Sequence, residues 1–92
     1  MKAKSRKQIK NSLATINVLD KQFKKAVIDT FGETDGIIFE KISSKEDDGH
    51  TYDTYHVYDE KDGEEKKDFN ILATSYTNDK NNKLYTKIIK VY

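Results

Sequence analysis

The chain lacks cysteine, so no disulfide can hold it together and no thiol can act as a nucleophile. Small secreted domains often depend on disulfides for their stability, which favours a reducing compartment for this chain. No apolar run approaches the ~18 residues of a membrane-spanning helix. No apolar stretch follows the basic N-terminus as a signal peptide requires. These absences predict a cytoplasmic protein without a membrane-spanning segment.

Motifs that carry chemistry are also missing. The chain has four glycines and no phosphate-binding Gly-rich loop, and its serines lie in no nucleophile motif. Its two histidines, His50 and His56, are expected to be exposed on one strand face, opposite Asp53, and a metal site normally needs three or four ligands. The acidic segment 59–65 lacks the ligand spacing of a calcium loop. We therefore expect no catalytic residue, no cofactor and no metal site, and hence a protein that is not an enzyme.

The residues that are present predict a small ordered core. The 92 residues include six tyrosines and four phenylalanines, whereas disordered chains are usually poor in aromatic residues. Charged residues make up 36% of the chain, which indicates a heavily solvated surface. A chain of this length forms one domain, so residues 1–92 are expected to be a single folding unit.

Residues 5–31 carry the pattern of an amphipathic helix. Apolar side chains recur at steps of three and four, which places them on one helix face; they are Ile9, Leu13, Ile16, Leu19, Phe23, Val27 and Phe31. Gly32 follows directly, where helices commonly end. We expect one long helix over 5–31, with residues 1–8 as a frayed basic terminus. Ser12 and Asp20 are both suitable N-caps, so two shorter helices are the alternative.

After Gly32 the hydrophobic period changes from 3.6 to 2, which is the period of a β-strand. Four strands are expected, at residues 36–43, 51–59, 67–77 and 83–92. Asp48-Gly49 supplies the positive-φ residues of a tight hairpin, and Asp62-Gly63 marks a second one. Residues 78–82 form the third connection.

These elements predict an α+β fold in which a long N-terminal amphipathic helix packs on a four-stranded antiparallel β-meander formed by residues 36–92. The α-β-β-β-β order is similar to that of cystatin-like proteins. The similarity is one of element order, because the QxVxG segment of inhibitory cystatins is absent, and no cystatin function follows from it. The last strand is expected at a sheet edge, where it could pair with a second copy. The sequence leaves monomer and homodimer open.

Charge is divided along the chain, although the net charge is only +1. Residues 1–31 hold seven Lys and one Arg against two Asp, whereas residues 32–92 hold nine Lys against fourteen acidic residues. Such asymmetry predicts that one part attracts polyanions or acidic partners while the other repels them. The alternative is a solvated surface whose halves neutralise each other within the molecule.

Three groups of side chains are candidate binding residues. The acidic group, which could stand in for phosphates in a nucleic-acid groove, comprises Asp47, Asp48, Asp53, Asp59, Glu60, Asp62, Glu64 and Glu65. The aromatic group, of a type that anchors protein interfaces, comprises Tyr52, Tyr58 and Tyr76. The basic group, whose charges could contact nucleic-acid phosphates, comprises Lys2, Lys4, Arg6, Lys7 and Lys10.

The leading hypothesis is a small non-enzymatic protein-binding module that uses its acidic surface against a larger protein, in particular a basic nucleic-acid-handling host protein. In size and composition the chain resembles the small phage- or mobile-element-encoded inhibitors of host defence, including anti-CRISPR proteins. Such an origin implies the host cytoplasm. Two alternatives are direct nucleic-acid binding through the basic N-terminal helix and a cystatin-like accessory domain of a conjugation or surface system.

Overall fold

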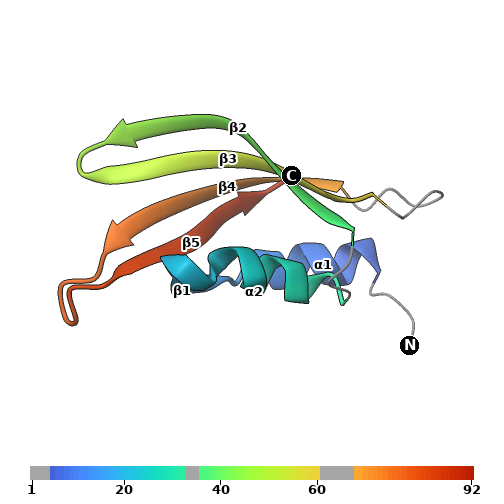
Figure 1. Cartoon of the computed structure of the whole chain (residues 1–92), viewed down its shortest axis with the longest axis horizontal. Helices are drawn as coiled ribbons and strands as arrows, with labels where there is room; N and C mark the ends of the chain where they lie inside the picture. Colours follow the sequence, from blue (N-terminus) through green and yellow to red (C-terminus); the bar gives the residue numbers. More distant parts are fainter. Residues whose placement is uncertain (1–4, 33–35, 61–67) are drawn as a thin grey trace.

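The computed structural model describes residues 5–32, 36–60 and 68–92. In this part of the chain a five-stranded antiparallel sheet forms one layer, and two helices lie against one of its faces (Figure 1). The elements are α1 (Arg6–Leu13), β1 (Asn17–Leu19), the 3-10 turn η1 (Asp20–Gln22), α2 (Phe23–Thr30), β2 (Ile37–Asp47), β3 (His50–Asp59), β4 (Asp68–Thr77) and β5 (Leu84–Val91). The α+β class and the antiparallel meander of β2 to β5 are confirmed.

The prediction of one long helix over 5–31 is wrong. Helix α1 ends at Leu13, and the Ser12 carbonyl accepts hydrogen bonds from both the backbone N–H (3.2 Å) and the hydroxyl (2.8 Å) of Thr15. The chain then extends as β1. The segment that follows the helix carries three β-branched residues, Thr15, Ile16 and Val18, which fit a strand better than a helix. Ile16, just before β1, and Val18, within it, both pack against the core. The apolar residues that suggested a continuous helix therefore include some that contact the core from extended backbone.

The two short helices begin and end on local signals. Ser5 caps α1, since its hydroxyl accepts from the Gln8 N–H (3.3 Å) while the Gln8 side chain accepts from the Ser5 N–H (2.9 Å). Asp20 does not cap α2, which continues directly from η1. Gly32 follows α2 with φ of 83°, a left-handed conformation that glycine adopts without strain. The alternative of two shorter helices is therefore the correct one.

The extra strand β1 changes the sheet. It pairs with β5, with Val18 opposite Thr86, so the strand order is β1-β5-β4-β3-β2. The last strand is therefore interior, and the prediction that it forms a sheet edge is wrong. The predicted α-β-β-β-β order is also wrong, because β1 lies between the helices. The edges of the sheet are β1, which is three residues long, and β2.

The β2–β3 hairpin turns at Asp48-Gly49, as the sequence predicts. Asp48 has φ of 51° and Gly49 has φ of 78°, which is the conformation of a two-residue primed turn. In such a turn the residues that flank the two turn residues pair with each other, here Asp47 with His50. Strand β2 therefore reaches Asp47 rather than ending at Ser43. A bulge displaces Ile42, which is 59% exposed on the edge strand. The predicted hairpin at 62–63 lies outside the described residues.

The core lies between the helices and one face of the sheet. Buried side chains of α1 and α2 meet those of β3, β4 and β5; the core comprises Ile9, Leu13, Phe23, Val27, Phe31, Val57, Phe69, Ile71, Ala73, Ile88 and Val91. Phe31, the C-cap residue of α2, and Phe69 of β4 pack edge to face with ring centroids 5.8 Å apart. No helix in the described ranges is long and apolar enough to cross a membrane.

Candidate functional site

The sheet has one face covered by the helices and one face that no described helix or strand covers, which we call the open face (Figure 1). Alternation along β3 assigns its residues to the two faces. Asp53, Val57 and Asp59 are buried on the helix side, while the open face carries the residues between them. The open-face residues of β3 are His50, Tyr52, Thr54, His56 and Tyr58.

The structure places the whole aromatic group on the open face, with Tyr52 and Tyr76 near each other and Tyr58 six residues farther along β3. Tyr52, Tyr58 and Tyr76 all lie there, half-buried, and Tyr85 of β5 joins them. Tyr76 stacks on Tyr85 with ring centroids 5.9 Å apart, and the Tyr76 hydroxyl donates to Asn17 Oδ1 of β1 (2.9 Å). These rings offer a large contact area at a small cost in side-chain entropy.

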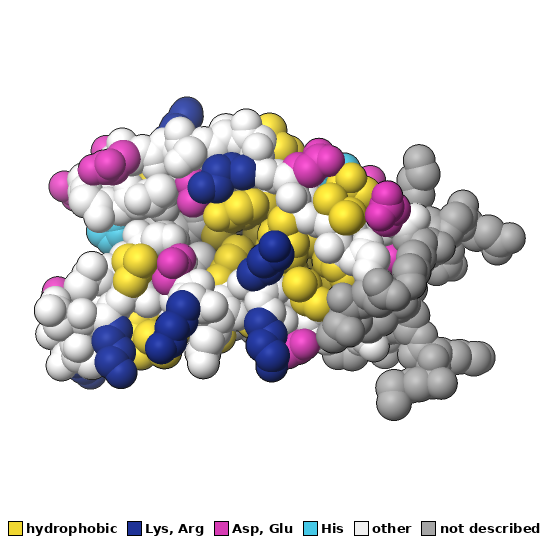
Figure 2. All heavy atoms as spheres, viewed as in Figure 1, with side chains coloured by type: hydrophobic (Ala, Val, Ile, Leu, Met, Phe, Trp, Pro, Cys, Tyr) yellow, Lys and Arg dark blue, Asp and Glu magenta, His cyan; other side chains and the backbone are white. Residues whose placement is uncertain are grey.

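The acidic group is not gathered in one place within the described residues. Asp47 and Asp48 are exposed at the β2–β3 turn, whereas Glu60 is exposed beyond the opposite end of β3. Ten residues of β3 separate these ends, or about 30 Å at the rise of a strand. Figure 2 shows magenta acidic side chains at both ends of this hairpin, with hydrophobic side chains gathered between the sheet and the helices. Asp62, Glu64 and Glu65 lie outside the described residues.

Asp53 has a structural environment on the helix side. It is 8% exposed and accepts hydrogen bonds from the Ser44 hydroxyl (2.5 Å) and the Tyr55 hydroxyl (3.4 Å), and the Lys41 ammonium lies 3.8 Å away. Burial of the ring, together with the Asp53 carboxylate, raises the pKa of Tyr55 to about 12. Asp53 is thus held by neighbours within the fold, and Asp59, at 7% exposure, is likewise buried.

The basic group is divided between the fold and the solvent. The Arg6 guanidinium donates to the Asp68 carbonyl (2.6 Å) and lies 4.5 Å from the centre of the Phe69 ring, so it joins α1 to β4. Lys7 and Lys10 are exposed on α1. Lys2 and Lys4 lie outside the described residues. Of the five residues predicted to contact phosphates, Lys7 and Lys10 are therefore two that the structure shows exposed to solvent.

The two histidines share the open face, opposite Asp53, as their spacing predicts. His50 Nδ1 lies 3.1 Å from the Asp48 carbonyl oxygen. His56 lies between two carboxylates, with Nε2 3.5 Å from Asp68 and Nδ1 4.0 Å from Glu40. Within residues 5–32, 36–60 and 68–92, no three His, Asp or Glu side chains are arranged to hold a metal ion.

A hollow of about 320 Å³ lies on the open face, between Thr54 and the β2–β3 turn. Its lining comes from β3, β4 and β5 and consists of His50, Tyr52, Thr74, Tyr76, Lys87 and Ile89. Thr74 stands at the centre of a cross-strand row, with Tyr52 opposite it on β3 and Lys87 opposite it on β5. Thr74 is 4% exposed, and its hydroxyl has no hydrogen-bond partner among the described residues. Buried polar groups are nearly always paired, so this one marks the hollow as unusual.

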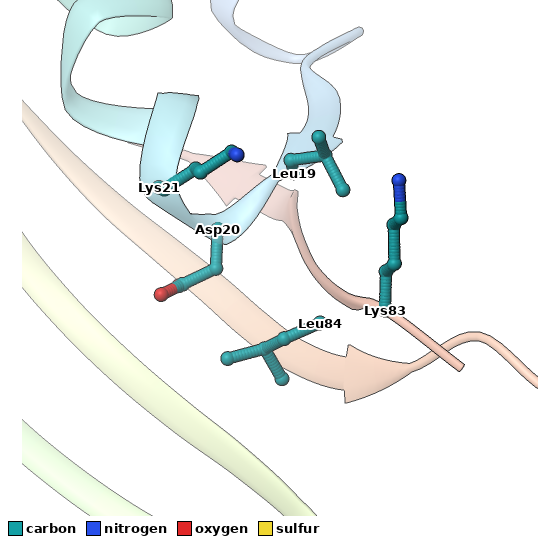
Figure 3. A pocket seen from close by; sticks show the side chains of 5 residues that line it. All are labelled: Leu19, Asp20, Lys21, Lys83 and Leu84. Carbon is teal, nitrogen blue, oxygen red and sulfur yellow. The ribbon is translucent and has the colours of Figure 1, made fainter. Parts of the chain in front are cut away.

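A second hollow of about 360 Å³ lies at the β1 edge (Figure 3). Leu19 and Leu84 supply its apolar walls, and the ammonium groups of Lys21 and Lys83 stand on either side of Leu19. Asp20 also lines it, but its carboxylate already accepts a hydrogen bond from the Thr86 hydroxyl (2.5 Å). Among the described residues, none that lines this hollow has a buried polar atom without a partner, so the open-face hollow is the stronger candidate.

Sequence reasoning found the tyrosines of this site but missed Thr74, Lys87 and Ile89. Alternation within the predicted strands places Thr74 on the same face of its strand as Tyr76. The meeting of Tyr52, Thr74 and Lys87 depends on the register of three strands. The position of Ile89 depends on a bulge, because Ala73 pairs with Ile88 while Leu72 pairs with Lys90. No local signal in the sequence reveals this bulge.

Comparison with protein-family models, with curated proteins and with solved structures found no match for this chain.

Proposed function

We propose that this protein is a non-enzymatic protein-binding module whose contact surface is the open face of the sheet. The observation that carries the proposal is the presence of four half-buried tyrosines on one face that no described element covers. Tyrosine is enriched at protein interfaces because its ring offers contact area and its hydroxyl offers a hydrogen bond. A larger protein is the partner that this surface fits, since the tyrosines spread over three neighbouring strands.

The charge of the partner is the next part of the proposal. The β2–β3 turn presents three exposed carboxylates in sequence, Glu46, Asp47 and Asp48, and Asp47 is the cross-strand neighbour of His50 on the open face. Carboxylates beside tyrosines suit a partner with a basic surface. This supports a basic nucleic-acid-handling host protein as the partner. The inhibition of host defence by a phage- or mobile-element-encoded protein stays a prediction from the sequence.

The contact surface is tested with two variants of the full chain. Thr54→Arg introduces a long charged side chain in the middle of the open face, outside the hollow. Lys25→Glu alters charge on α2, where Lys25 is exposed and its ammonium lies 3.6 Å from the Asp29 carboxylate. The partner is first captured from the host lysate with the wild type and then purified. We expect the purified partner to bind the wild type and Lys25→Glu, and to lose binding to Thr54→Arg. Binding that survives Thr54→Arg and fails with Lys25→Glu would contradict the proposal.

The charge of the partner is tested separately at the β2–β3 turn. Because Asp53 and Asp59 are buried, charge reversal there would disturb the fold rather than the surface alone. Asp47→Lys with Asp48→Lys reverses exposed charges only. We expect this double variant to weaken binding to a basic partner, and more so at low ionic strength. Unchanged binding would exclude a role for the acidic turn.

Direct nucleic-acid binding through α1 is the second candidate, and the exposure of Lys7 and Lys10 is the observation that favours it. A mobility-shift titration at two salt concentrations tests this candidate, because phosphate contacts weaken as salt rises. Removal of residues 1–4 together with Lys7→Gln and Lys10→Gln keeps Arg6 in place. Affinity that does not change in this variant excludes the mechanism.

A further inference from the structure

The Thr74 hydroxyl is the starting point, because it is the one buried side-chain polar atom without a partner among the described residues. A hydroxyl that is buried without a hydrogen bond destabilises the folded state. Valine has nearly the same shape and carries no such cost. Thr74 lines the hollow, so a change of its χ1 rotamer would turn this enclosed hydroxyl towards a ligand bound there.

The other lining groups define the chemistry of that ligand. The rings of Tyr52 and Tyr76 and the Ile89 side chain form flat and apolar walls. Lys87 is exposed, forms no ion pair with a described residue, and holds its ammonium 5.8 Å from the centre of the Tyr76 ring. No acidic side chain lines the hollow. The lining thus combines apolar surfaces with a hydroxyl donor and one uncompensated positive charge.

We infer that this hollow is a binding site for an aromatic carboxylate. The ring of the ligand lies against Tyr52 and Tyr76, and its carboxylate accepts hydrogen bonds from Thr74 Oγ1 and Lys87 Nζ. The volume of about 320 Å³ is at the small end of ligand sites, which fits a single ring with a short acid chain. This site goes beyond the proposed function, since a free acid requires no protein partner.

The probe is N-acetylphenylalanine, titrated into the isotope-labelled full chain and followed by amide chemical shifts. We expect a dissociation constant on the order of 1 mM, typical of a ligand of this size. The shifts should be largest at Tyr52, Thr74, Tyr76 and Lys87. N-acetylphenylalanine amide, which has the same ring and no charge, is expected to bind about 10-fold more weakly. Equal binding of acid and amide, or shifts confined to other surfaces, would overturn the inference.

Two variants test the polar contacts, and each leaves the fold in place. Thr74→Val removes the hydroxyl and is expected to weaken binding of N-acetylphenylalanine about 10-fold. Thr54→Val makes the same chemical change on the same face outside the hollow, and binding should stay the same. Lys87→Gln removes an exposed charge and is expected to weaken binding about 3-fold. Wild-type affinity in both Thr74→Val and Lys87→Gln would contradict the assignment of the hollow as an aromatic carboxylate site.

The aromatic carboxylate could be a free small acid or the C-terminal residue of a protein. Acetyl-Ala-Ala-Phe with a free C-terminus separates these sources. Tighter binding of this peptide than of N-acetylphenylalanine identifies a chain terminus, and equal binding identifies a free acid. Thr54→Arg tests the proposed protein contact outside the hollow, so failure of one idea is distinguished from failure of the other.

Discussion

The helix-covered face and the open face of the sheet are built from alternate residues of the same strands, yet they differ in almost every property. On β4, Phe69, Ile71 and Ala73 are at most 2% exposed beneath the helices. Between them, Asn70 and Leu72 are only half-buried on the open face. The strands therefore hold the fold together through one set of side chains and present a surface through the other.

Because the two faces use different side chains, residues of the open face can bind a partner without a loss of core packing. Polar groups on the helix side are held by partners within the fold, as Asp53 is by Ser44, Tyr55 and Lys41. On the open face, Thr74 and Lys87 have no such partner among the described residues. A buried group that serves the fold is normally satisfied, and an unsatisfied one points to a different role.

The largest expected difference between the faces concerns two adjacent residues of β4. Ile71→Ala removes a fully buried side chain and is expected to lower the free energy of unfolding by about 2–5 kcal/mol, because it leaves a cavity. Leu72→Ala acts on the half-buried open side and should cost about 1 kcal/mol. Urea unfolding followed by circular dichroism measures both. Equal losses would show that the open face is covered in solution, for example by a second copy.

The acidic residues give the second comparison. Asp53→Ala leaves the Ser44 and Tyr55 hydroxyls without their acceptor and is expected to cost about 1–3 kcal/mol of unfolding free energy. Asp47→Ala changes an exposed side chain and should stay within about 0.5 kcal/mol of the wild type. The same unfolding assay applies. A loss at Asp47 as large as that at Asp53 would argue against the division of the acidic group into buried and exposed members.

The third comparison is between tyrosines and depends on pH. Burial and the Asp53 carboxylate raise the pKa of Tyr55 from 10.0 to about 12, so Tyr55 should be the last tyrosine to ionise in an ultraviolet titration. Between these two pH values the folded protein keeps a proton that the unfolded chain has lost. The contribution of Tyr55 to stability is therefore complete below pH 10 and declines as pH rises towards 12. Tyr55→Phe should remove both the late titration step and this part of the alkaline loss.

The smallest effect compares two threonines on opposite faces. Thr86 Oγ1 donates to Asp20 and lies 3.0 Å from Ser75 Oγ, so Thr86→Val is expected to cost about 1 kcal/mol. Thr74→Val removes an unpartnered hydroxyl and should leave stability unchanged or raise it by up to about 1 kcal/mol. Thermal unfolding of the two variants side by side is the measurement. A clear loss in Thr74→Val would mean that the hydroxyl has a partner in solution.

Sequence reasoning succeeded where the cause is local. The Asp48-Gly49 turn follows from the need for two positive φ angles, and the strand periods of two separate Tyr52 and Tyr58 from Asp53. It failed at residues 15–19, where an apolar spacing compatible with a helix belongs to a strand. Residues 17–19 pair with β5, which is some seventy residues away in sequence, instead of continuing the helix. No local pattern contains that partner.

The candidate site divides in the same way. The tyrosines were identified from the sequence, because residue type and alternation place them on one strand face. Their grouping with Thr74 and Lys87 was not, because it depends on the pairing of three strands. The acidic group was selected by composition, and composition does not reveal that Asp53 and Asp59 point towards the helices.

By itself the sequence determined the class of the fold, the hairpin turn and the two residue sets of each strand, because propensity and periodicity act over a few neighbouring residues. Only the tertiary structure decided where the long helix breaks, which strands form the edges and which side chains meet in the hollow. These outcomes arise from hydrogen bonds and contacts between segments distant in the chain, whose free energies outweigh local preference.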